Sequence, residues 1–358
     1  MSVKRVTAGT KWKVLALLML VVGALTLAAC GSSSRTSGGS ATSSEGSSGS
    51  SEGGESVAGK KVVLVSCGDS NPWCKVYNSA IIEGLEAEGV HVQYLQDPFE
   101  PTLQVQHLES AIGQKPSLIL VVASNDDSIV PSLNKAKAAG VPVINLNGRP
   151  AEASEPLLTA SIEANQEQLG QFAAENIIEG LEKEGKKSGN IMAITGTAAT
   201  HTTEDRMKAF KEVLAEHPQY KLVEEQDGNW DPILTAKLAS QIFAKYQNSG
   251  GIQGAYGMAD YQANAIIQAA EQAGIPVGVE NDGLIVTGSN CFPEGIENIE
   301  AGKQNGTATQ APGVEGEFVV PLVVEVLEGK EIEHTNKKQE SRIDPANVKK
   351  FKAQCTFS

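Results

Sequence analysis

The sequence has few of the features that mark catalytic and nucleic-acid-binding proteins. Neither G-x-G-x-x-G nor H-E-x-x-H occurs, which excludes those dinucleotide and metalloprotease fingerprints. The five histidines are scattered without metal-ligand spacing to a cysteine, so no metal site is predicted. A formal net charge of −14 leaves no basic stripe for phosphates, which excludes a nucleic-acid partner and favours a soluble monomer. We therefore expect neither catalytic residues nor a cofactor.

The first thirty residues predict export. A basic start is followed by an apolar run over residues 14–29, which is shorter than the roughly 20 residues that a membrane span needs. The run ends in Leu27-Ala28-Ala29-Cys30, which looks like the lipobox of bacterial lipoproteins. An ordinary cleaved signal ending at a cysteine is the alternative. We expect a signal peptide over residues 1–30, a lipid on Cys30, and a position on the outer face of the cell membrane.

The next segment is too polar to fold. Residues 31–56 are almost wholly Ser, Gly, Thr, Ala and Glu, so we expect a flexible tether over residues 31–58. The remaining chain of about 300 residues is long enough for one large domain or two ordinary ones.

Short β-branched runs alternate with longer amphipathic segments in this body. The runs are residues 61–66, 91–95, 117–122, 141–146, 190–195, 221–225, 252–256, 284–288 and 307–310. This alternation predicts an α/β fold with parallel sheets covered on both faces. Nine strands favour two Rossmann-like lobes over one sheet, with residues 157–162 as the first crossing between them. Among the intervening helices, residues 72–88 have one apolar face, with Asn71 as the cap and Gly89 at the end.

Unusual residues follow the predicted strands, where open α/β sheets bind ligands. The candidate ligand-binding residues are Asn71, Trp73, Asn147, Arg149, Thr202, Arg206, Trp230, Asp260, Asn290 and Gln310. Planar aromatic rings with amides, hydroxyls and few charges are typical of a small-molecule cleft.

Several of these residues have a simpler interpretation. The two tryptophans can fill core space, although as a pair at opposing strand ends they favour the two walls of a flat slot. The two asparagines after strands can be turn residues, and Arg149 can be a surface residue. Asp260 is either the cap of a helix over residues 261–273 or an acceptor for ligand hydroxyls.

Arg206 is the most informative candidate. It lies in the first turn of a helix, where a cation is unfavourable by several tenths of a kcal/mol. Either it pairs locally with Glu204 or Asp205 or is a solvated surface residue, or it is a forked donor to ligand oxygens.

The cysteines suggest a rigid loop. With Cys30 set aside, Cys67, Cys74, Cys291 and Cys355 allow three pairings. Outside the cytoplasm disulfides persist, and we favour Cys67 with Cys74 and Cys291 with Cys355. Unpaired buried thiols, and an activated thiolate at Cys291 in an extracytoplasmic enzyme, are the alternatives.

Five sequence motifs occur in a characteristic order: Asn71-Pro72-Trp73, AAGVPVINLN at 138–147, RMKAF at 206–210, Ala259-Asp260 and GTATQAP at 306–312. In their order and spacing they resemble the type I periplasmic solute-binding proteins of ABC importers. The resemblance is to the sugar-binding branch with the ribose- and galactose-binding proteins, and it covers residues 60–341.

The resemblance implies two lobes that close around a ligand about a three-strand hinge. Residues 59–161 with 311–340 would form the N-terminal lobe, and residues 162–310 with 341–358 the C-terminal lobe. It places stacking aromatics at Trp73 and Trp230 and polar contacts at Asn71, Arg206 and Gln310. It also implies capture of a monosaccharide or polyol for membrane permease subunits, without catalysis. A sensor that signals to a membrane receptor is the alternative.

The chain departs from the family pattern at the polar end of the slot. Relatives commonly carry acidic residues where Asn147 and Asn290 stand, and here Gly148 precedes Arg149. Two strong acceptors for sugar hydroxyls are therefore missing, which makes an acidic sugar or another small metabolite a competing ligand.

Overall fold

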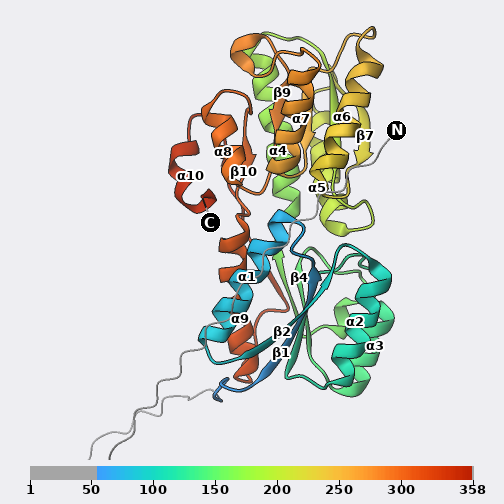
Figure 1. Cartoon of the computed structure of the whole chain (residues 1–358), viewed down its shortest axis with the longest axis vertical. Helices are drawn as coiled ribbons and strands as arrows, with labels where there is room; N and C mark the ends of the chain where they lie inside the picture. Colours follow the sequence, from blue (N-terminus) through green and yellow to red (C-terminus); the bar gives the residue numbers. More distant parts are fainter. Residues whose placement is uncertain (1–54, 357–358) are drawn as a thin grey trace, which may run out of the picture. The chain divides into compact units, whose positions relative to one another are not determined.

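The computed structural model describes residues 55–356, which belong to one compact unit with two lobes (Figure 1). The expected signal peptide, Cys30 and most of the tether lie outside the described residues. The tether was expected to reach residue 58, but Val57 packs into the core of the N-terminal lobe. The folded body therefore begins before residue 59, because burying an apolar side chain next to the first strand lowers the free energy of the folded state. Within residues 55–356 no helix combines the length and the hydropathy needed to cross a bilayer.

The N-terminal lobe is built on a six-stranded parallel sheet with the order β11-β5-β4-β3-β1-β2. The strands are β1 (Lys61–Cys67), β2 (His91–Asp97), β3 (Leu118–Val121), β4 (Val143–Asn147), β5 (Ala160–Ala164) and β11 (Thr335–Lys338). The helices are α1 (Pro72–Ala87), α2 (Pro101–Gly113), α3 (Val130–Ala139) and α9 (Pro312–Leu327), with a short η1 (Glu155–Leu157). Side chains alternate along β1: Val62 and Leu64 pack toward α1 and α9, while Val63 and Val65 pack toward α2 and α3.

The C-terminal lobe repeats this architecture with a four-stranded parallel sheet in the order β7-β6-β8-β9. The strands are β6 (Gly189–Thr195), β7 (Tyr220–Asp227), β8 (Gly254–Gly257) and β9 (Ile285–Thr287). The helices are α4 (Gln166–Lys183), α5 (His201–Ala215), α6 (Pro232–Tyr246), α7 (Asp260–Gln272), α8 (Pro293–Glu300) and α10 (Val348–Cys355), with a short η2 (Val279–Asn281). Along β6, Ile191 and Ala193 pack with α4 and α5, while Met192 and Ile194 pack with α6 and α7.

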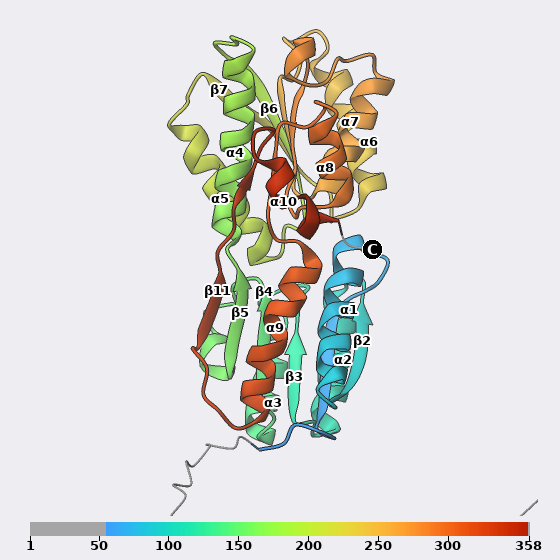
Figure 2. The ribbon, with the colours of Figure 1, turned by 90° about the vertical axis from the view of Figure 1, so that its left-hand side faces the viewer.

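The chain passes between the lobes three times: between β5 and α4, between β10 (Thr307–Ala308) and α9, and between β11 and β12 (Arg342–Ile343). Strands β10 and β12 pair antiparallel beside the C-terminal lobe. Figure 2 shows α9 and β11 in the N-terminal lobe, with α8 and α10 in the other. The first crossing lies beyond residues 157–162, because β5 stays paired with β4 as far as Glu163 and with β11 as far as Ala164.

All nine predicted runs contain strands, and the helix predicted over residues 72–88 is confirmed as α1. Asn71 caps it by accepting a hydrogen bond from the Cys74 amide at 3.1 Å. The proposed capping role of Asp260 is wrong, because α7 begins at Asp260 itself and the extended residue before it is Ala259.

Candidate ligand-binding site

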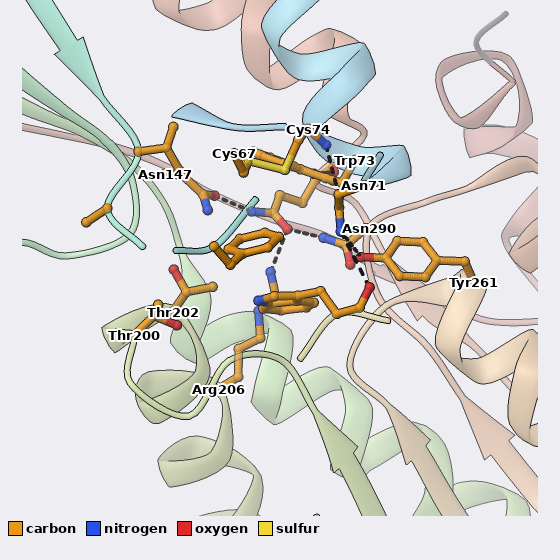
Figure 3. A pocket seen from close by; sticks show the side chains of 15 residues that line it. Cys67, Asn71, Trp73, Cys74, Asn147, Thr200, Thr202, Arg206, Tyr261 and Asn290 are labelled. Atoms are coloured by element: carbon orange, nitrogen blue, oxygen red, sulfur yellow. Dashed lines mark hydrogen bonds between the residues drawn. A yellow bond between two sulfur atoms is a disulfide. The ribbon is translucent and has the colours of Figure 1, made fainter. Parts of the chain in front are cut away.

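A pocket lies between the lobes at the carboxyl ends of the parallel strands, where this fold class binds ligands (Figure 3). It contains about 460 Å³ of space not filled by atoms, part of it open to solvent. The lining residues are Cys67, Asn71, Trp73, Cys74, Phe99, Val122, Ala123, Asn147, Thr200, Thr202, Arg206, Trp230, Tyr261, Asn290 and Gln310.

Most of the residues predicted from strand ends meet in this pocket. Those that line it are Asn71, Trp73, Asn147, Thr202, Arg206, Trp230, Asn290 and Gln310. Their contact with a ligand stays a prediction. Arg149 and Asp260 are not among the lining residues.

Asp260 points away from the pocket into the C-terminal lobe. Its carboxylate accepts hydrogen bonds from the Phe292 amide at 2.9 Å, from Gln304 Nε2 at 2.7 Å and from Thr307 Oγ1 at 2.9 Å. Burial raises the pKa of Asp260 to about 7 against the opposing effect of these donors. The carboxylate satisfies donors behind the pocket wall, so it does not serve as the expected ligand acceptor.

Arg149 lies on the rim of the cleft, where it binds the opposite lobe. Its Nε and Nη2 donate to the two carboxylate oxygens of Asp205 at 3.2 and 3.1 Å, and Nη2 also approaches Glu204 at 3.4 Å. Nearby, Asp126 accepts a hydrogen bond from the His201 amide at 2.7 Å. The acids expected as local partners of Arg206 are therefore occupied by Arg149, and the rim contacts hold the lobes together.

The loop between β1 and α1 forms one side of the pocket. The structure contains a Cys67–Cys74 disulfide, and both cysteines line the pocket. Asn71, inside the loop, donates to Tyr261 Oη on the opposite lobe at 3.2 Å. The Trp73 ring stacks on Tyr77 with a centroid distance of 4.3 Å. The disulfide thus ties the capping residue and the tryptophan to the end of β1.

Cys291 is not a free thiol. It forms the second disulfide, with Cys355 of α10, and both cysteines are fully buried. The interpretation as an activated thiolate is therefore wrong.

Arg206 lines the pocket and is 1% exposed. Its Nε donates to Gln166 Oε1 at 2.8 Å, its Nη1 to the Met258 carbonyl at 2.8 Å and its Nη2 to Gln310 Oε1 at 2.7 Å. Burial lowers the pKa of Arg206, although the group remains a cation at neutral pH. The guanidinium therefore joins α5 to two of the three hinge crossings, because Gln166 follows β5 and Gln310 follows β10.

The Trp230 ring is held by two close neighbours. The Arg206 guanidinium lies 5.4 Å from its centroid, within range of a cation–π interaction. A Cβ at Gly196 would lie 1.9 Å from the ring, so only glycine allows this approach. These contacts fix the orientation of the ring in the pocket lining.

Left-handed backbone conformations concentrate around the pocket. Positive φ angles occur at Phe99 (56°), Asn147 (73°), Trp230 (55°), Asn290 (84°) and Gln310 (91°), and each of these residues lines it. Such conformations are unfavourable for residues other than glycine and tend to occur at binding sites. Here they turn side chains at strand ends inward.

Several lining residues and one supporting residue were not predicted from the sequence. Val122 and Ala123 follow β3, so the strand-end rule contained the signal for them. Tyr261 lies inside α7, and Gln166 follows a strand that was taken for a crossing, so neither carried a usable signal.

Within residues 55–356 no group of His, Cys, Asp and Glu could hold a metal ion. The lining offers hydrogen bonds and stacking surfaces.

Comparison with known proteins gives the same fold and one family. A family model described as a periplasmic binding protein domain matches residues 62–331. The D-allose-binding periplasmic protein of Escherichia coli K12 is 25% identical over 72% of this chain and 81% of its own length. The ribose import binding protein of the same strain is 19% identical over 78% of this chain and 88% of its own.

Two solved structures share the fold. The crystal structure of a galactofuranose binding protein has a TM-score of 0.76 at 18% identity, covering 82% of this chain and 98% of that one. The fructose-binding periplasmic domain of a hybrid two-component system has a TM-score of 0.72 at 20% identity, covering 82% and 94%. Because the family model spans well over half of the sequence, the chain belongs to the periplasmic binding protein family.

Proposed function

We propose that this protein is the extracytoplasmic substrate-binding component of an ABC importer. It binds a monosaccharide or polyol between its lobes and delivers it to permease subunits in the membrane. It is a binding protein and not an enzyme, in agreement with its family. The fold and the relatives named above support this function.

The observation that carries the proposal is the composition of the interlobe pocket. Trp73 and Trp230 line it together with amide, hydroxyl and guanidinium groups. Aromatic rings can stack on the apolar face of a sugar ring, while polar groups at the edge bind its hydroxyls. Asn71 and Arg149 both contact the opposite lobe, so closure encloses whatever occupies the pocket.

The test is a ligand panel measured by thermal shift and by tryptophan fluorescence. A ligand that binds only the folded protein raises the melting temperature by mass action. We expect at least one sugar or polyol to do so with micromolar affinity or better and to change the emission of the pocket tryptophans. If every pentose, hexose, polyol and sugar acid leaves both signals unchanged, the proposed function is wrong.

We further propose that Cys30 anchors the protein by a lipid to the outer face of the cell membrane. Its lipobox-like context supports this, and so do two disulfides, which persist in oxidising compartments. Mass spectrometry of the mature N-terminus tests the anchor: an unmodified cysteine there would contradict it.

The same fold also occurs in the periplasmic domain of a two-component system, which supports a sensor as the second candidate function. Transport assays distinguish the two. Loss of this protein abolishes ligand uptake if it serves an importer, whereas in a sensor it abolishes only the transcriptional response.

A further inference from the structure

The pocket holds a buried positive charge that has no negative partner in contact. Arg206 is 1% exposed, and its partners are the neutral oxygens of Gln166, Met258 and Gln310. Of the ion pairs between residues 55 and 356, none includes Arg206. Asp205 is taken by Arg149. A buried charge without a counter-ion is costly, and a ligand anion would compensate it.

Arg206 also determines how the surrounding amides are oriented. A guanidinium only donates hydrogen bonds, so Gln166 and Gln310 must turn their side-chain oxygens toward it. Their amide nitrogens then face Asn147 Oδ1, at 3.3 and 2.9 Å. Asn290 presents its nitrogen to Gln310 Oε1, which leaves its Oδ1 facing the Ser289 and Met258 carbonyls without a donor; the opposite orientation would serve those carbonyls but place two side-chain oxygens in contact.

As a result, the side-chain groups of the lining that remain free to hydrogen-bond with a ligand are mainly donors. Asn147 Oδ1 and Gln310 Oε1 each accept two hydrogen bonds already, and Asn71 Oδ1 accepts one from the Cys74 amide. The Asn147 amide nitrogen and the Thr202 hydroxyl have no hydrogen-bond partner among the described residues, and both residues line the pocket (Figure 3). The lining contains no Asp or Glu.

We propose that the pocket prefers a monoanionic ligand, a sugar or polyol that carries one carboxylate, over the neutral compound of the same skeleton. This rests on the proposed function and names its substrate class. The carboxylate binds beside Asn147, Thr202 and Arg206, and the hydroxylated carbon skeleton lies against the tryptophans. A neutral sugar needs acceptors for its hydroxyl hydrogens, and the amide oxygens of Asn147 and Gln310 already accept two hydrogen bonds each. A phosphate dianion would find a single cation in the lining.

Matched ligand pairs test the proposal by calorimetry on the purified full chain. The pairs are galactose and galacturonate, glucose and glucuronate, ribose and ribonate, and galactitol and galactonate, with glucose 6-phosphate as the dianion. We expect an acid to bind at least roughly tenfold more tightly than its neutral partner, as charge-assisted hydrogen bonds allow. If the neutral member binds equally or better in every pair that binds, or if the phosphate binds best, this inference is overturned while the proposed function stands. If none of these compounds binds although a neutral sugar or polyol of the thermal-shift panel does, the inference alone is overturned; if nothing in that panel binds, the proposed function is overturned as well.

Asn147→Asp provides a second, independent test. Aspartate tolerates the left-handed backbone at this position and places a carboxylate where the ligand anion would lie. We expect acid affinity to fall roughly tenfold or more while neutral affinity holds or rises. Asn134→Asp makes the same charge change at an exposed position of α3 and is the matched control. If the ratio of the affinities for the acid and for its neutral partner changes equally in both variants, the inference is overturned. Melting temperatures establish that both variants are folded.

Discussion

At the residue scale, Arg206 links the two lobes through neutral groups. Its three oxygen partners come from β8 and from both adjacent hinge crossings, and the glutamines lie 40 and 104 residues away in sequence. The fork geometry of the guanidinium suits this task, because its donors leave in fixed directions from one plane. The ammonium group of lysine is a compact charge, and at this position it can donate to only one or two of these three oxygens.

Arg206→Lys should therefore reduce both ligand binding and stability while keeping the charge. We expect a roughly 100-fold loss of affinity and a stability loss of about 2 kcal/mol, since two buried amide oxygens lose their donors. Calorimetry and denaturant unfolding measure the two effects. Arg149→Lys is the control, because its carboxylate partners on the rim accept from lysine as well. Equal effects of the two variants would contradict a special role for the Arg206 fork.

Which residues lie near the site could be predicted from the sequence, but their partners and side-chain directions could not. The helix dipole indicated that Arg206 needs a partner beyond its own first turn, but the partners lie far off in sequence and belong to the hinge. Asp260 follows a strand as the true lining residues do, yet the loop before α8 and Thr307 draw its carboxylate to the other side. The direction of a side chain at a helix start depends on which distant donors need an acceptor, and no local pattern contains that information.

At the element scale, the start of α1 is fixed before any ligand arrives. The Cys67–Cys74 disulfide, the Asn71 cap and the stacking of Trp73 on Tyr77 act within one turn of the helix. A binding loop that is already ordered loses less conformational entropy when ligand binds.

Replacing Cys67 and Cys74 by serine should weaken binding as well as stability. Closing so short a loop contributes about 2–3 kcal/mol in the chain-entropy model, so unfolding in denaturant should shift by that amount. Ligand affinity should fall several-fold, mainly through slower association, because Asn71 and Trp73 must then be ordered on binding. Stopped-flow tryptophan fluorescence measures this. Unchanged association with reduced stability would show that the disulfide serves the fold alone.

The elements that the sequence predicted are those with a buried apolar pattern. β1 and β6 carry alternating side chains for two cores and were recognised by that pattern. Edge strand β11 reads Thr-Asn-Lys-Lys and is half exposed, so hydrophobicity gave no signal for it. Residues 157–162 were predicted as a crossing, yet β5 begins at Ala160 and carries Ser161 and Glu163, which hydrogen-bond to each other inside the sheet. Buried polar residues that satisfy one another in this way interrupt the apolar pattern by which a strand is recognised.

At the scale of the whole folded body, contacts between the lobes occur at three places around the pocket. Asn71 binds Tyr261 on one side, Arg149 binds Asp205 on the rim, and Gln310 joins Asn147 to Arg206 at the hinge. Gly148 permits close approach, since a Cβ there would lie 2.5 Å from the Thr202 hydroxyl. Ligand affinity and lobe closure are therefore linked, because the same side chains serve both.

The hinge also contains buried acids that make stability depend on pH. Glu315, at the start of α9, faces Lys338 at 2.7 Å and lies near Glu340 and Tyr77. Burial, and then the charge of Glu340, raise the pKa of Glu315 to about 8. Between its usual value of 4.5 and 8, the folded protein keeps a proton that the unfolded chain releases, so stability falls as the pH rises. Asp97, Asp126 and Asp260, with raised pKa values, act in the same direction.

Glu315→Gln should reduce this pH dependence without abolishing it. Glutamine keeps an oxygen for Lys338 and removes the carboxyl whose ionisation is unfavourable beside Glu340. We expect the wild-type protein to lose stability as the pH rises from 5 to 8 and the variant to lose clearly less, with little further difference above pH 8. Urea unfolding at pH 5, 7 and 9 measures it. Glu317→Gln, two residues along the same helix and exposed, should follow the wild type. If Glu315→Gln does so too, the hinge carboxylates are ionised in the folded protein at little cost.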